Sequence, residues 1–192
     1  APPSPRLFEL DTTPSQPGNT EVLARFFVDH ALTNPANRAI LERLPGLSLP
    51  DAWLVAGCLF QTCWNLRSGR PPADGIRDYD VFYFDASDLS PEAEERVGQR
   101  VQAACADLGV AVEVKNQARV HTWYEAYFGA PYSPLRNVME GIDRFLVDGT
   151  CVGLQARIDG LSLMHTMDST LCCKACCAPA AAAPIHGCMP PR

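Results

Sequence analysis

Two aspartates, Asp78 and Asp80, stand two positions apart at the start of the apolar run DYDVFYFD. The run is rich in aromatic and β-branched residues, which is typical of a β-strand, and side chains at i and i+2 of a strand project to the same side, about 6.6 Å apart. Two carboxylates so placed repel each other, and a divalent cation between them would compensate. The pattern therefore indicates a metal-binding pair. An equally weighted structural reading makes Asp78 a cap of the turn after Gly75 and Asp80 a solvated residue at a strand edge.

A third acid, Glu113, lies in the next predicted strand, within VAVEVKNQARV at residues 110–120. It stands between Val112 and Val114, so its side chain projects to the side opposite theirs. A single acid in an apolar strand is usually a solvent-facing edge residue. Beside an aspartate pair it becomes a candidate functional residue.

A glycine precedes a predicted helix in AWLVAGCLFQTCWNLRSG. Residues 53–56 are predicted to be a short apolar strand or a helix end, and residues 59–67 show helical spacing of apolar side chains. Gly57 and Cys58 would then stand at a helix N-terminus, where unpaired backbone N–H groups and the helix dipole can hold a phosphate and a glycine leaves the approach open. The alternative, which is the more common case, is a tight strand-to-helix turn.

Four basic side chains are candidate phosphate or acceptor contacts. Arg77 lies beside the aspartate pair, Arg119 and His121 follow the second predicted strand, and Arg144 lies further along the chain. For each of them the alternative is ordinary polar surface.

Helical patterns alternate with these strands. Helices are predicted at residues 20–32, 37–44 and 91–108, the last with Ser90 as N-cap, Pro91 at its first position and Gly109 past its end. A further helix at residues 118–128 is predicted with Asn116 as its cap. Its predicted core residues are Val120, Trp123 and Tyr127.

Composition limits the classes of function. The chain has 192 residues, 47% of them apolar and 20% charged, as expected for one globular domain. A net charge of −6 argues against a protein that binds nucleic acid over a broad basic surface. The longest uncharged run is too short and too polar to span a bilayer, and the first residues have no apolar signal region, so a cytoplasmic location and no membrane contact are expected.

Both ends differ in composition from the middle of the chain. Residues 1–19 are predicted to be a disordered proline-rich arm, residues 20–167 the folded domain, and residues 168–192 a non-globular tail rich in Cys, Ala and Pro. The tail contains CCKACC, which could bind zinc, but four cysteines within six residues lack the loop that zinc sites need, so a shifted reading frame or a non-native end is favoured. The remaining cysteines are expected to be buried thiols: Cys58, Cys63, Cys105 and Cys151.

The order of these parts resembles the polymerase-beta-type nucleotidyltransferase superfamily. Residues 24–163, with DAWLVAGCLFQTCWNLRSGRPPADGIRDYDVFYFD, VEVKNQARVHTWYEAYFG and IDRFLVDGTCVGLQ, look like a bacterial nucleotidyltransferase-like family formerly known only as an uncharacterised domain. The resemblance implies an α+β fold, a mixed β-sheet with helices packed on one side and an active site on the open face.

The resemblance also implies roles for the candidate residues. Asp78, Asp80 and Glu113 match the catalytic, metal-binding carboxylates for Mg²⁺ or Mn²⁺, and Gly57 with Cys58 matches the Gly-[Gly/Ser] element that holds phosphates. Cys58 departs from the common Ser, and a thiol is the poorer hydrogen-bond donor. The implied reaction moves a nucleoside monophosphate from a nucleoside triphosphate to an unknown acceptor hydroxyl. The alternative is a catalytically silent nucleotide-binding or partner-binding module on the same fold.

Overall fold

The protein is described by a computed structural model that covers residues 20–146, 150–157 and 160–165. The predicted arm at residues 1–19 and the tail at residues 168–192 lie outside the described residues. The helices are α1 (Thr20–Ala31), α2 (Pro35–Arg43), α3 (Gly57–Arg67), α4 (Pro91–Ala104), α5 (Tyr124–Phe128) and α6 (Val138–Ile142), with 3-10 turns η1 (Leu44–Leu47), η2 (Ala106–Leu108) and η3 (Gln117–Thr122). None of the described helices is long and apolar enough to cross a membrane.

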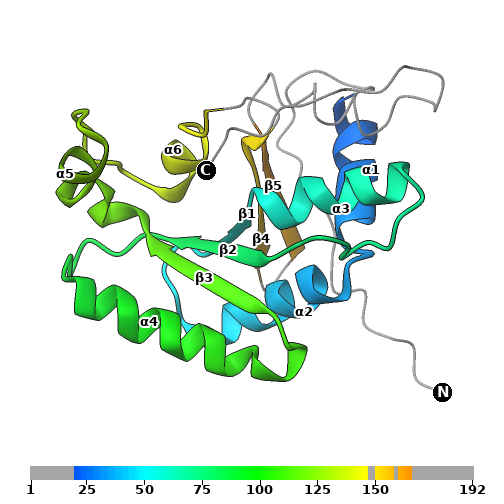
Figure 1. Cartoon of the computed structure of the whole chain (residues 1–192), viewed down its shortest axis with the longest axis horizontal. Helices are drawn as coiled ribbons and strands as arrows, with labels where there is room; N and C mark the ends of the chain where they lie inside the picture. Colours follow the sequence, from blue (N-terminus) through cyan, green and yellow to red (C-terminus); the bar gives the residue numbers. More distant parts are fainter. Residues whose placement is uncertain (1–19, 147–149, 158–159, 166–192) are drawn as a thin grey trace.

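The described strands form one mixed five-stranded sheet in the order β3-β2-β1-β4-β5 (Figure 1). The strands are β1 (Trp53–Val55), β2 (Asp78–Tyr83), β3 (Ala111–Asn116), β4 (Val152–Arg157) and β5 (Gly160–His165). Only β2 and β3 are parallel; β1 is antiparallel to β2 and β4, and β4 is antiparallel to β5. The fold is therefore α+β, as the resemblance implied.

The main core lies on one face of the sheet, under α1 to α4. Leu54, Val81 and Leu154 point from neighbouring strands into this core and are completely buried. At an apolar transfer energy of about 25 cal/mol per Å², such side chains contribute roughly 1.5–3 kcal/mol each to folding. The predicted N-cap of α4 is confirmed, because the Ser90 hydroxyl accepts a hydrogen bond from the Ala93 backbone N–H.

A smaller apolar cluster covers part of the opposite face. Trp53 and Val55 of β1 pack there against Val138 and Ile142 of α6, with Phe82 at the margin. The helix α6 therefore covers one end of the sheet face that carries the aspartates. The smaller cluster does not extend over Asp78 and Asp80. The four cysteines of the folded part are buried thiols and form no disulfide among the described residues: Cys58, Cys63, Cys105 and Cys151.

The predicted helix at residues 118–128 is wrong in form. Asn116 caps the segment as expected, but residues 117–122 form the 3-10 turn η3, and a short α5 follows. A 3-10 turn has three residues per turn, so the change shifts the phase of the helical pattern. Val120 is buried as predicted, Trp123 is only half-buried, and Tyr127 is 79% exposed instead of lying in the core.

Candidate active site

Strand β2 positions the aspartate pair in the interior of the sheet, between β1 and β3. Its exposure alternates: Tyr79, Val81 and Tyr83 are buried, while Asp78 is exposed and Asp80 is half-buried. The two aspartates therefore share the face opposite the main core, as the sequence pattern predicted. Because β2 has a neighbour on both sides, Asp80 is not a residue at a strand edge.

Glu113 lies directly beside Asp80. The parallel register of β2 and β3 pairs Asp80 with Glu113, and paired residues on neighbouring strands, about 4.8 Å apart, project to the same side. The register thus brings Asp78, Asp80 and Glu113 together on one face. Glu113 is exposed, and β3 is the edge strand of the described sheet.

The surroundings of Asp80 make its carboxylate harder to ionise. Burial raises the pKa of Asp80 to about 6, and the charges of Asp78 and Glu113 add to the increase, whereas Lys115 acts against it. Ionised Asp80 is thus destabilised in the folded protein, which favours any cation that comes to share its charge. Perturbed carboxyl groups of this kind gather at functional sites more often than elsewhere.

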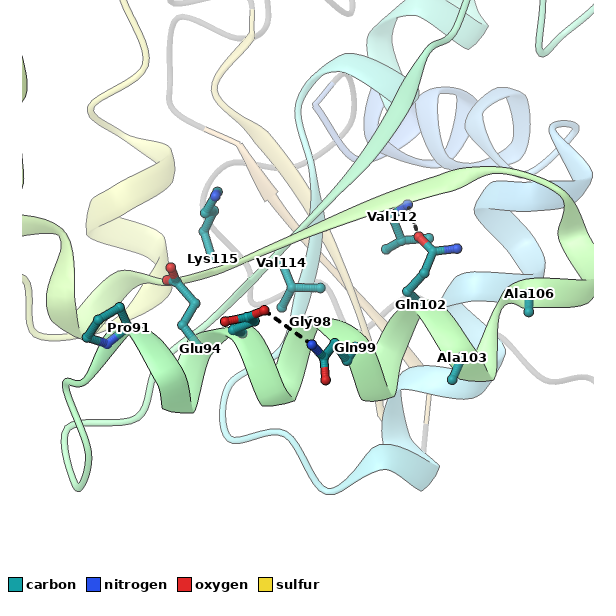
Figure 2. Close-up of a pocket in the computed structure, with 11 residues that line it drawn as sticks. Pro91, Glu94, Gly98, Gln99, Gln102, Ala103, Ala106, Val112, Val114 and Lys115 are labelled. Atoms are coloured by element: carbon teal, nitrogen blue, oxygen red, sulfur yellow. Dashed lines mark hydrogen bonds between the residues drawn. The ribbon is translucent and has the colours of Figure 1, made fainter.

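Lys115, which sequence reasoning missed, lies two residues after Glu113 on the same side of β3. Figure 2 shows its side chain projecting away from α4, whereas Glu94 and Gln102 lie on the α4 side. Lys115 also borders the groove between α4 and β3 in that view, as do Glu94 and Gln102. There the Gln102 side chain accepts a hydrogen bond from the Val112 N–H at 2.8 Å and so covers part of the free edge of β3.

The turn before α3 brings a helix N-terminus next to this face. Because β1 and β2 are antiparallel and Val55 pairs with Asp80, the chain leaving β1 runs toward Asp78. Ala56 then adopts φ 52° and ψ −117°, a backbone conformation that costs a non-glycine residue about 1–3 kcal/mol, and α3 begins at Gly57. A side chain at Gly57 would meet nothing within 4 Å, so space is open there. A strained turn beside clustered acids indicates a site.

Cys58 does not present its thiol to that space. The side chain is completely buried in the main core, and its Sγ lies 3.7 Å from the Val55 carbonyl oxygen, to which it donates. Burial raises the pKa of the Cys58 thiol well above its ordinary value, and the Asp80 charge acts in the same direction. Any phosphate binding at this turn must therefore come from backbone N–H groups.

A buried polar network connects the turn to β2. The Asn34 Nδ2 donates to the Thr62 hydroxyl at 3.1 Å and to the Tyr79 hydroxyl at 3.2 Å. The Asn37 Nδ2 donates to the Cys58 carbonyl at 3.2 Å, and the Thr62 hydroxyl donates to the same carbonyl at 2.6 Å. Tyr79 lies between the two aspartates in sequence, so the network couples the first turn of α3 to the strand that carries them.

The structure distributes the basic candidates differently. Arg77 is exposed next to Asp78. Arg119 does not reach the acids: it donates to Glu94 of α4 at 2.7 Å in an ion pair whose side chains are 11% and 15% exposed. His121 is partly buried, and its buried Nδ1 has no hydrogen-bond partner among the described residues. Arg144 lies over the Tyr132 ring at 4.4 Å.

The donor set suits a hard cation. Carboxylate oxygens are the ligands that Mg²⁺ and Mn²⁺ prefer. Among the described residues, no three His, Cys, Asp or Glu side chains converge closely enough to hold one ion. Asp78 and Glu113 are exposed strand residues whose side chains can rotate, so the backbone register, not the side-chain pose, defines the candidate site.

Comparison with known proteins identifies the family and a similar fold. A family described as nucleotidyltransferase matches residues 42–170. An NMR structure described as revealing a CCA-adding enzyme head domain is similar at 26% sequence identity with a TM-score of 0.58, over 81% of this chain and 76% of that chain. The curated proteins contain no match. Because the family match covers more than half of the sequence, the chain belongs to this nucleotidyltransferase family.

Proposed function

We propose that the protein transfers a nucleoside monophosphate from a nucleoside triphosphate to an acceptor hydroxyl, with Mg²⁺ or Mn²⁺ held by Asp78, Asp80 and Glu113. The observation that carries the proposal is the strand register, which aligns Asp80 with Glu113 on one side and with Val55, just before the Gly57 turn, on the other. Family membership and the similarity to a CCA-adding enzyme head domain support nucleotidyl transfer in general.

In the proposed reaction, different residues bind the phosphates and the cation. The backbone N–H groups at Gly57 and Cys58 bind phosphate oxygens, aided by the helix dipole. Arg77 is the exposed cation nearest in sequence to the acids and contacts the triphosphate. The acceptor oxygen bonds to the α-phosphorus, the bond from that phosphorus to pyrophosphate breaks, and the acceptor proton passes to water. A divalent cation bound by the carboxylates would stabilise the negative charge that develops on the phosphoryl oxygens.

A catalytically silent module is the second candidate. The observation that favours it is the ion pair between Arg119 and Glu94. The Arg119 side chain, a predicted nucleotide contact, is engaged with Glu94 instead. A module that binds nucleotide without turnover would need the Gly57 turn and the acids but no further cation.

Thermal unfolding of the full chain tests the proposal. A nucleoside triphosphate and Mg²⁺ together should stabilise the fold far more than either alone. At about 100 times the dissociation constant the gain is about 2.7 kcal/mol, or roughly 5–10 °C for a chain of this size. Asp80→Asn should abolish the metal-dependent part of the shift.

The matched control is Asp29→Asn, the same change at an exposed position of α1, which should keep the full shift. Absence of any shift in the wild type would refute the nucleotide site. A shift without a transfer product in mass spectrometry, across a set of acceptors, would favour the silent module.

A further inference from the structure

The segment around α5 exposes an unusual number of aromatic side chains. Tyr127 is 79% exposed and Phe128 is 58% exposed, although both belong to a five-residue helix. Exposed rings in one place on a protein surface indicate a contact site more often than scattered single residues do. The segment projects at the end of the molecule opposite α1 (Figure 1).

These rings form a continuous row. Tyr127 contacts Phe128 with ring centroids 4.8 Å apart, Phe128 contacts Tyr124 at 4.6 Å, and Tyr124 contacts Tyr132 at 4.4 Å. The Arg144 guanidinium lies over the Tyr132 ring at 4.4 Å from its centroid. We use the name aromatic row for Tyr127, Phe128, Tyr124 and Tyr132 with Arg144.

The aromatic row leads back to the candidate active site. Phe145, which follows Arg144, stacks on Phe82 with ring centroids 5.7 Å apart. Phe82 is two residues after Asp80 on the same face of β2. Arg144 of the row and Phe145 of this stacked pair are consecutive residues, so the chain itself places the inner end of the aromatic row next to the strand that carries Asp80.

The chemistry of the row selects one class of ligand. Aromatic faces and an arginine guanidinium stack with nucleobases. Each stacked base contributes about 1–3 kcal/mol to the binding free energy, and any of the bases can stack in this way. The net charge of −6 argues against broad neutralisation of phosphates. The row offers one cation, Arg144, because the exposed Arg136 nearby is paired with Glu140. A ligand held here must bind mainly through its rings.

We infer that the acceptor in the proposed transfer is the end of a single-stranded nucleic acid, whose last bases stack along the aromatic row and whose terminal hydroxyl reaches Asp78, Asp80 and Glu113. This inference rests on the proposed function for the reaction, whereas stacking on the row is measured without any reaction. It also reconciles an acidic protein with a nucleic-acid substrate, because stacking replaces phosphate contacts.

Fluorescence anisotropy of a labelled oligoadenylate of about eight nucleotides tests the inference on the full chain. Tyr127→Ala and Phe128→Ala should each weaken binding about fivefold to a hundredfold. The matched control is Phe26→Ala, which removes a 39% exposed phenylalanine from α1. With one cation in the row, raising salt from about 50 to 200 mM should weaken binding only about threefold.

The outcomes separate the two proposals. Loss of oligonucleotide binding in both row variants, with wild-type binding in Phe26→Ala and an unchanged triphosphate-dependent thermal shift in all three, supports the inference. Absence of oligonucleotide binding by the wild type, or equal binding by the row variants, overturns it. If the row variants bind the oligonucleotide normally but lose transfer to a protein acceptor, the row is a protein contact and the inference is wrong. Absence of a triphosphate-dependent shift in every variant instead refutes the proposed function.

Discussion

The two faces of β2 use the same strand for opposite purposes. On one face, Tyr79, Val81 and Tyr83 are buried in the main core and stabilise the fold. On the other, Asp78 and Asp80 repel each other, and Asp80 is held partly away from water. Burial on the core face stabilises the fold enough to offset the repulsion on the other face, so substitutions on the two faces should differ in the sign of their effect on stability.

The largest effect is expected on the core face. Leu54 is completely buried and pairs with Val81 across β1 and β2. Leu54→Ala should lower the free energy of unfolding by about 2–5 kcal/mol, because the substitution leaves a cavity that the packed core cannot fill. Urea denaturation would measure the loss. Asp78→Asn, on the open face, should stay within about 0.5 kcal/mol of the wild type or gain stability. Equal losses of unfolding free energy in Leu54→Ala and Asp78→Asn would show that the two faces contribute to stability in the same way.

A second prediction contrasts two arginines that both looked like phosphate contacts. Arg119 forms the partly buried ion pair with Glu94, so Arg119→Leu should cost roughly 2–4 kcal/mol of stability by leaving that carboxylate without its partner. Arg77→Leu, at an exposed position, should change stability by no more than about 0.5 kcal/mol but weaken triphosphate binding. Thermal unfolding with and without triphosphate measures both quantities. If Arg119→Leu is as stable as the wild type but binds triphosphate more weakly, Arg119 is the nucleotide contact and not a structural residue.

The contrast between these arginines also shows what sequence could predict. The Asp78 and Asp80 pattern, the turn at Gly57 and the Ser90 cap were predictable because each depends on a few neighbouring residues. The partner of Arg119 was not, since Glu94 lies 25 positions away and only the packing of η3 on α4 brings them together. Tyr127 was misplaced because the 3-10 geometry of η3 changed the helical phase.

The buried hydrogen-bond network around Asn34 could not be predicted from the sequence for a similar reason. Asn34 bonds to Thr62 and Tyr79 over 28 and 45 positions, and an isolated Asn in a sequence has no signal for such partners. Likewise, α6 covers one end of the open face although its own sequence shows only a short apolar pattern. The acids were predicted by type and spacing, whereas the elements that surround them depend on tertiary structure.

A third prediction concerns the pH dependence of stability. The pKa of Asp80 is about 6 in the folded protein, above its ordinary value of 3.8, so the folded state binds the proton more tightly than the unfolded state. The contribution of this group to stability is therefore full below about pH 4 and is lost as pH rises to about 6. At neutral pH, where Asp80 is ionised in both states, the lost contribution is on the order of 3 kcal/mol, because one unit of pKa difference corresponds to about 1.36 kcal/mol.

Asp80→Asn should remove the loss of stability that ionisation of Asp80 causes as the pH rises. The difference in unfolding free energy between Asp80→Asn and the wild type, without added metal, should grow in favour of the variant between about pH 4 and pH 6 and then stay constant. Chemical denaturation across this range measures the difference and cancels the contributions of carboxyl groups that do not interact with Asp80. A difference that does not change with pH would mean that neither burial nor the neighbouring charges raise the pKa of Asp80 in the folded protein.

The smallest expected effect tests whether the core face positions the open face. Tyr79→Phe removes the hydroxyl that accepts a hydrogen bond from Asn34, and the expected loss of stability is about 0.5–1.5 kcal/mol, because Asn34 keeps its bond to Thr62. Tyr83→Phe is the matched control on the same strand and face, since no described residue forms a hydrogen bond with the Tyr83 hydroxyl. If the network aligns the Gly57 turn with β2, Tyr79→Phe should also raise the Mg²⁺ concentration needed for half of the triphosphate-dependent thermal shift, by severalfold, a readout that a purely structural loss would leave unchanged. Tyr83→Phe should leave it at the wild-type value. Equal Mg²⁺ requirements in the two variants would show that the network only stabilises the core and that the turn and the strand align without it.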